Sequence, residues 1–301
     1  MSIKHSTATN LYEQLQEVRD TLQEASAAKW TDHEIYSKLN AAQLHIARKS
    51  LCLKKEVTIT TTEGTREYNL KTTTNPFSDI IDISEDGVHY YINGSTYMPL
   101  IYKTIGQLNK EFPNWQGASN GIPQYYYYNK ASKTIGLYPE PNSSNAGAYL
   151  FVSGYHKPKV LIAGTASSGS VTTLVMPAGT STIPYPSVTD DYYNSLYLEV
   201  YSGTGAGQKL LITDYVGSTR TLTFATATAP DSSSIFGFCA EIPESFQPLM
   251  VLYALWHLLG KGGSRVSLAN NYRQEYIVGL SEAISETMDE PDEMLIKDSY
   301  R

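Results

Sequence analysis

Apolar residues near the start of the chain recur with the spacing of an α-helix. A first stripe consists of Leu11, Leu15, Val18 and Leu22, which share one side of a helix. A second helix is predicted to begin at WTDHEI, where Thr31 is the N-cap and Glu34 completes a capping box. Its apolar stripe consists of Ile35, Leu39, Ala42 and Ile46. We expect the two helices to form an antiparallel hairpin.

From Lys54 onwards the apolar period changes to two, which is typical of β-strands. The stretch VTITTTEGTREYNL predicts a hairpin that turns at Glu63-Gly64, and IIDISEDGVHYYIN predicts one that turns at Asp86-Gly87. Further strands are predicted in QYYYYNK, KTIGLYPEP and AYLFVSGYHKP, with a short helix near KTIGQLNKEF. We assign residues 55–160 to one β-rich domain.

Residues 161–240 differ from the preceding domain in composition. They are rich in Thr, Ser, Gly and Ala and poor in charge. Short strands are predicted in VTTLVM, LYLEVYS, QKLLITDY and RTLTFAT. This pattern predicts a small β-sandwich or barrel module of its own, inserted between the β-rich domain and the last part of the chain.

Helical periodicity returns at IPESFQPLMVLYALWHLLG. Ser245 is the predicted cap, Pro248 is tolerated in the first turn, and Gly260 is the predicted stop. The stripe of a last helix consists of Tyr272, Tyr276, Leu280, Ile284 and Met288. Neither helix pair can bury its apolar stripe alone, so we expect the pairs to pack together.

The predicted fold class is therefore α+β. Residues 1–54 and 241–288 form an antiparallel helical bundle from both chain ends, and two antiparallel β-rich modules are inserted between them. Residues 289–301 remain as a C-terminal segment. The longest apolar run, residues 246–259, is shorter than the ~20 residues of a membrane span and contains Pro248 and His257, so we expect no membrane helix.

Composition narrows the class of function. The 301 residues carry a formal net charge of −7, which argues against a protein that grips nucleic acid through its phosphates. The 24 tyrosines fit antiparallel sheet. The start of the chain lacks an apolar signal segment, and Cys52 and Cys239 are too few for a disulfide framework, so we expect a cytosolic folding compartment and two semi-buried thiols.

The stretches that resemble phosphate-binding or metal-binding motifs do not have the residue spacing that those motifs require. In SGTGAGQK, Gln208 separates Gly207 from Lys209 and a strand pattern follows, so we interpret the stretch as a turn and not as a phosphate loop. His33-Glu34 lacks the second histidine of a zinc site, and Asp190, Asp191 and Asn194 lack the pattern of a calcium loop. His257 is expected to be a core or interface histidine. We predict no catalytic residue, metal or cofactor.

The C-terminal segment combines charge with apolar residues. An acidic region that ends at Glu293 is followed by Met294, Leu295 and Ile296 within MLIKDSYR. These three residues, with Tyr300 and Arg301, are candidates for docking on a partner. Packing back onto the same subunit is the alternative.

An ordered set of weak motifs resembles the head-to-tail adaptor proteins of tailed bacteriophages. The string GIPQYYYYNKASKTIGLYPEPNSSNAGAYLFVSGYHKP is preceded by WTDHEIYSKLNAAQLHIARKSL and followed by IPESFQPLMVLYALWHLL. The likeness covers roughly residues 10–160 and 241–288. The stretch with DDYYNSLYLEVYSGTGAGQKLLITDY is similar to a small β module found as an insertion in phage virion proteins. Relatives join the β domain to the third helix by a short linker, so this module is a departure.

The resemblance implies a structural virion protein, assembled in the host cytoplasm, and not an enzyme. Such adaptors form a dodecameric ring under the portal protein, extend the DNA channel and meet tail or nozzle proteins. Their C-terminal tails reach onto the portal, which would give the candidate docking residues a partner. DNA would pass without sequence recognition, because an acidic wall repels its backbone.

Two other functions fit parts of the sequence. A carbohydrate-binding or glycan-cleaving tail protein could use the tyrosines at 125–128 as a sugar platform, and cleavage would need paired carboxylates beside a groove. A virion decoration protein would bind the capsid and not the portal.

Overall fold

The computed structural model describes residues 10–24, 29–70, 79–92, 96–143, 148–180, 184–261 and 265–287. The chain divides into two compact units, one made of Met1–Cys52 with Pro158–Arg301 and the other of Leu53–Lys157. Helices and mainly antiparallel sheets both occur, which confirms the α+β class.

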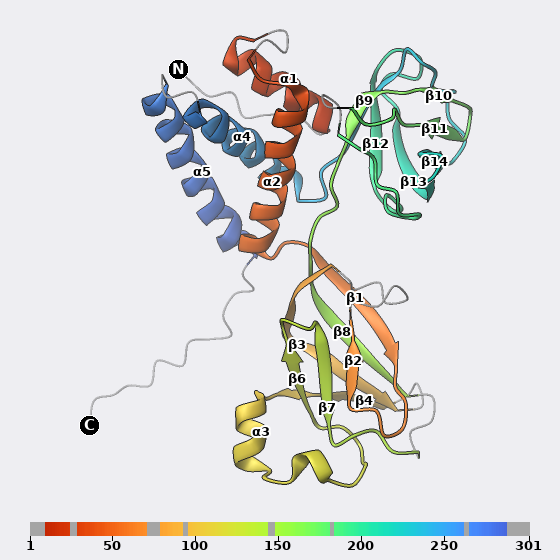
Figure 1. Cartoon of the computed structure of the whole chain (residues 1–301), viewed down its shortest axis with the longest axis vertical. Helices are drawn as coiled ribbons and strands as arrows, with labels where there is room; N and C mark the ends of the chain where they lie inside the picture. The colour runs from red at the N-terminus through yellow and green to blue at the C-terminus, as the bar shows by residue number, and fades with distance from the viewer. Residues whose placement is uncertain are drawn as a thin grey trace. The chain divides into compact units, whose positions relative to one another are not determined.

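The described residues of the first unit form four α-helices (Figure 1): α1 (Leu11–Leu22), α2 (Asp32–Ser50), α4 (Gln247–Lys261) and α5 (Val266–Thr287). Local signals set their starts. The Asn10 side chain accepts a hydrogen bond from the Glu13 backbone N–H at the start of α1. At the start of α2, Thr31 and Glu34 form the predicted capping box, which satisfies two backbone donors that have no partner inside the helix.

Helices from both ends of the chain share one core in this unit. α4 packs against α1, α2 and α5, and α2 also packs against α5. Both predicted N-terminal stripes are buried. α4 contributes its own apolar side, which includes Met250, Leu255 and Leu258. The mostly apolar α4 therefore lies among the other three helices and removes their stripes from water.

The predicted ends of α4 were wrong. A short 3₁₀ turn, Glu244–Phe246, precedes the helix, so Ser245 lies within that turn and does not cap α4. Gly260 lies inside the helix, which continues to Lys261. Pro248 does occupy the first turn, where its missing N–H costs no hydrogen bond.

The second β module belongs to the same unit as the helices. Its strands form one seven-stranded sheet in the order β10-β11-β14-β13-β12-β15-β9. Their bounds are β9 (Ala163–Thr165), β10 (Ser168–Gly169), β11 (Thr173–Val175), β12 (Tyr197–Ser202), β13 (Lys209–Val216), β14 (Thr221–Phe224) and β15 (Ile235–Phe238). α1 packs on β15 and β9. The Asn10 amide also donates a hydrogen bond of 3.0 Å to Glu199 of β12.

The glycine-rich stretch SGTGAGQK is a turn between two paired strands, as predicted. β12 and β13 pair antiparallel, and the loop joins them. Gly203, Gly205 and Gly207 all have φ of +82°, a conformation that only glycine adopts readily. At Gly203 a Cβ would lie 2.1 Å from the Ser233 carbonyl oxygen, so this position also requires the absence of a side chain.

In the part of the second unit that the structure describes, the strands form two four-stranded sheets. One has the order β1-β8-β3-β4 and the other the order β2-β7-β6-β5. Their bounds are β1 (Lys54–Thr60), β2 (Glu67–Asn69), β3 (Ile80–Ile92), β4 (Thr96–Pro99), β5 (Ile101–Tyr102), β6 (Tyr125–Asn129), β7 (Thr134–Tyr138) and β8 (Tyr149–His156). Residues of both sheets form one buried cluster, which includes Val57, Tyr90, Leu137 and Val152.

Both predicted hairpins of this unit were wrong. β1 pairs with β8, and β2 pairs with β7 in the other sheet, although Glu63-Gly64 does form a turn. Ile80–Ile92 is a single strand whose register against β8 shifts between Ile83 and Val88. The register shift requires glycine at position 87, because a Cβ there would lie 2.6 Å from the Ser153 carbonyl oxygen of β8.

Candidate functional site

A short helical segment in the second unit positions the residues around a pocket. The sequence predicted a short helix near KTIGQLNKEF, and α3 (Ile105–Glu111) lies there. It begins at a capping box between Thr104 and Gln107. A 3₁₀ turn, η1 (Trp115–Gly117), follows it. Leu108, Trp115 and Tyr127 form a buried cluster, which joins this segment to the sheet that contains β6.

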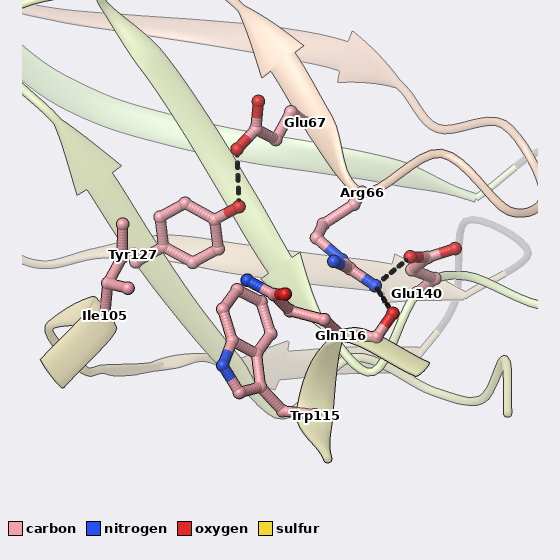
Figure 2. Close-up of a pocket in the computed structure, with 7 residues that line it drawn as sticks. All are labelled: Arg66, Glu67, Ile105, Trp115, Gln116, Tyr127 and Glu140. Atoms are coloured by element: carbon pink, nitrogen blue, oxygen red, sulfur yellow. Dashed lines mark hydrogen bonds and ion pairs between the residues drawn. The ribbon is translucent and has the colours of Figure 1, made fainter. Parts of the chain in front are cut away.

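The pocket lies between this segment, the start of β2, the middle of β6 and the residues just after β7 (Figure 2), and it has a volume of about 410 Å³. Its lining consists of Arg66, Glu67, Ile105, Trp115, Gln116, Tyr127 and Glu140. These residues are widely separated in the sequence, so no local motif marked them. The nearest sequence signal was the tyrosine run at 125–128.

The charged groups of the pocket bind one another. The Arg66 guanidinium forms an ion pair of 2.5 Å with Glu140 and donates a hydrogen bond of 2.6 Å to the Gln116 carbonyl oxygen. It also lies 4.9 Å from the centre of the Trp115 ring. The Tyr127 hydroxyl donates to Glu67 at 2.6 Å. Burial, and then the hydrogen bond to Glu67, raise the pKa of Tyr127, so this hydroxyl stays a donor.

The aromatic residues of this region are used in packing. Trp115 is 3% exposed and Tyr127 also 3%. Tyr126 is buried in the core between the two sheets, and Tyr125 contacts Phe112 and Tyr138. A sugar platform requires exposed ring faces, so the tyrosine run does not have the geometry that the glycan hypothesis needs. The residues that line the pocket therefore join the sheet to the α3–η1 segment.

Removing the Arg66 side chain should destabilise the second unit. Arg66→Ala leaves Glu140 and the Gln116 carbonyl without their partner and uncovers Trp115. We expect the free energy of unfolding to fall by about 1–3 kcal/mol, measured by urea denaturation. Lys130→Ala is the control, because its ion pair with Asp82 is largely exposed and is worth only about 0–1 kcal/mol. Equal losses in both variants would contradict this role of Arg66.

A second group of functional interest lies on the helices of the first unit. His45 of α2, Tyr253, Trp256 and His257 of α4 and Tyr276 of α5 form a connected set of aromatic contacts. The Tyr276 hydroxyl lies 2.6 Å from His45 Nδ1. Tyr276 is 2% exposed, whereas the other four are half-buried. His257 thus lies at the border between core and surface.

The sequence-derived metal candidates do not form a site. Among the residues that the structure describes, no group of three or more His, Cys, Asp or Glu could hold a metal ion. Glu34 binds Thr31 and Lys261. Asp190 accepts a hydrogen bond from the Gly217 N–H, and Asp191 accepts one from the Asn194 amide. These oxygens therefore stabilise a helix start and turns.

Both cysteines are free thiols, as the sequence predicted. Cys239 is buried and Cys52 is partly buried. Burial raises the pKa of Cys239 to about 11 and also raises that of Cys52. A thiol with a raised pKa carries little thiolate at neutral pH and is a poor nucleophile.

The five predicted docking residues lie outside the described part of the chain. These residues are Met294, Leu295, Ile296, Tyr300 and Arg301. Their role stays a prediction. None of the described helices is long and apolar enough to cross a membrane.

The comparisons with known proteins identify the class. The model of a family described as SU10 adaptor protein matches residues 9–196. That match includes α1, α2, the whole second unit and the first part of the second β module. The class is therefore a structural adaptor of the bacteriophage virion. Because the match extends over more than half of the chain, the chain belongs to the SU10 adaptor protein family. No curated protein matches it.

Proposed function

We propose that the protein forms a homo-oligomeric ring, a dodecamer, beneath the portal, where it extends the DNA channel and joins the portal to tail or nozzle proteins. The observation that carries this proposal is the family match, which includes both N-terminal helices and the complete second unit. The helices build the ring and contact the portal, and the β-rich parts meet tail components. The protein is a virion component that is assembled in the host cytoplasm.

The charge of the chain suits the wall of a DNA channel. Asp and Glu number 30 against 23 Lys and Arg, for a formal net charge of −7. A channel wall with an excess of like charge repels the phosphate backbone, so DNA passes without being held or read. The role is structural, and no reaction is assigned to the protein.

Electron microscopy of the purified protein, alone and with the portal protein of the same phage, tests the proposal. We expect rings coaxial with the portal. A protein that remains monomeric both with and without the portal contradicts it. Selective binding on a glycan array would instead support the tail-protein alternative. Co-sedimentation with capsids that lack a portal would support the decoration alternative.

The C-terminal segment is proposed to dock on the portal through Met294, Leu295, Ile296, Tyr300 and Arg301. Deleting residues 289–301 should weaken portal binding at least about tenfold, or ~1.4 kcal/mol, because three apolar side chains lose their contacts. Surface plasmon resonance with immobilised portal measures the change. The control replaces the acidic residues at 289, 290, 292 and 293 with their amides and leaves the apolar residues in place. Unchanged affinity of the deletion variant would discard the docking role.

A further inference from the structure

α5 has an outer surface that its own unit does not cover. This helix buries only one stripe, which consists of Ala269, Tyr276, Leu280 and Ala283. Elsewhere it exposes large apolar side chains, at 50% for Val266, 39% for Leu268, 42% for Ile277 and 58% for Val278. Exposed apolar residues that are scattered singly are ordinary, so these four mark only the part of α5 that its own unit leaves uncovered.

One flank of this helix is acidic. Glu275, Glu282 and Glu286 recur at i, i+7 and i+11, and we call them the acidic edge. At ~100° per residue they lie on one side of the buried stripe, and Arg273 lies on the other. Among the described residues, none of these three carboxylates forms an ion pair.

On the other side of the buried stripe, the helices α2, α4 and α5 carry positively charged residues and aromatic side chains. We call this set the basic face: Lys38, His45 and Lys49 of α2, Trp256 and His257 of α4, and Arg273 of α5. The Arg273 guanidinium lies 5.5 Å from the centre of the Trp256 ring. Lys38, Lys49 and Arg273 form no ion pair with any other described residue.

The charge of the basic face comes from its lysines and its arginine. Burial, and then the nearby Lys49, lower the pKa of His45, and burial lowers that of His257, so both imidazoles are neutral at pH 7. Arg273 thus lies over the half-buried Trp256, and Lys49 and Lys38 lie close enough to His45 and His257, respectively, to act on their charge. Tryptophan and arginine together are the residue types most enriched at the energetic centres of protein interfaces.

We propose that α5 forms the contact between neighbouring copies of this chain, in which the acidic edge of one copy meets the basic face of the next. Three unpaired carboxylates match three unpaired cations in number and sign. Because the two surfaces lie on different flanks, the contact is head-to-tail, and such contacts close into rings when the rotation between copies permits. This inference rests on the ring proposed above and assigns its interface.

Charge reversal tests the contact in the full-length chain. One variant carries Glu282→Lys and Glu286→Lys, and a second carries Lys49→Glu and Arg273→Glu. We expect each alone to raise the concentration for half-maximal assembly at least tenfold in sedimentation velocity. Portal is added where the wild type needs it. The control, Asp20→Lys with Asp214→Lys, makes the same charge change as the first variant at exposed residues of α1 and β13 and should assemble as the wild type does.

Mixing the two reversed variants gives the decisive result. In the mixture, the reversed, positive edge of the first variant can meet the reversed, negative face of the second. The unchanged acidic edge of the second variant can likewise meet the unchanged basic face of the first. We therefore expect equimolar mixing to restore rings with alternating subunits. Thermal melting curves verify that each variant is folded. Normal assembly of either folded variant alone, or no recovery on mixing, overturns the assigned interface. A wild type that never assembles contradicts the proposed function itself.

Discussion

Replacing Leu39 with alanine should lower the free energy of unfolding of the helical unit by about 2–5 kcal/mol. Leu39 lies in the middle of α2 and is 0% exposed. α2 packs against α1, α4 and α5, so a cavity at this point weakens contacts between the two ends of the chain. Urea denaturation followed by far-ultraviolet circular dichroism measures the loss.

The half-exposed Leu44 on the same helix provides the control for this prediction. Leu44→Ala removes the same atoms with the same change of helix propensity, but its side chain is already partly in contact with water. We expect its effect to be less than half of that of Leu39→Ala. Comparable losses in the two variants would show that α2 does not bury the side observed here.

Replacing Gly237 with alanine should destabilise the same unit by about 1–3 kcal/mol, because the added methyl group has no space. Gly237 lies in β15, and a Cβ there would be 2.8 Å from Asn10 Oδ1 and 2.9 Å from the Tyr12 backbone nitrogen. The substitution would push the start of α1 away from the second β module. It would also disturb the Asn10 cap of α1.

Gly164→Ala is the matched control, because Gly164 lies on the neighbouring strand β9 and pairs with Phe236 of β15. A Cβ at Gly164 would lie 3.6 Å from Pro177, an ordinary contact. We expect little change in its thermal midpoint, and a drop of several degrees for Gly237→Ala. Equal midpoints would mean that α1 can move away from β15 without loss. A lower midpoint in Gly237→Ala alone would show that the β module stabilises the helices.

The pocket in the second unit could not be located from the sequence. Arg66 and Glu140 are separated by more than seventy residues and meet only because β2 pairs with β7. The tyrosine run at 125–128 could be recognised, but tyrosine occupies both faces of the predicted strand, so the sequence does not show which of these side chains are buried. The pairing of β6 with β7 and the covering segment α3–η1 decided that Tyr126 and Tyr127 are buried.

The basic face was partly visible. His257 was predicted to be a core or interface histidine, and it lies half-buried among aromatic rings. Its neighbours His45 and Arg273 come from helices more than two hundred residues apart. Only the packing of α2, α4 and α5 brings these two side chains to the aromatic rings of α4.

The sequence by itself determined the features that depend on a few neighbouring residues. The capping box of Thr31 and Glu34, the buried stripes of α1 and α2, the turn at SGTGAGQK and the short helix at 105–111 all follow from contacts within about eleven positions. Only the tertiary structure decided which strands pair. Backbone hydrogen bonds are the same for every partner, so β1 pairs with β8 because that register buries Val57 opposite Val152. Gly87 shows the same limit, since a glycine after an acidic residue is typical of a hairpin turn, yet here it lets β3 approach the backbone of β8.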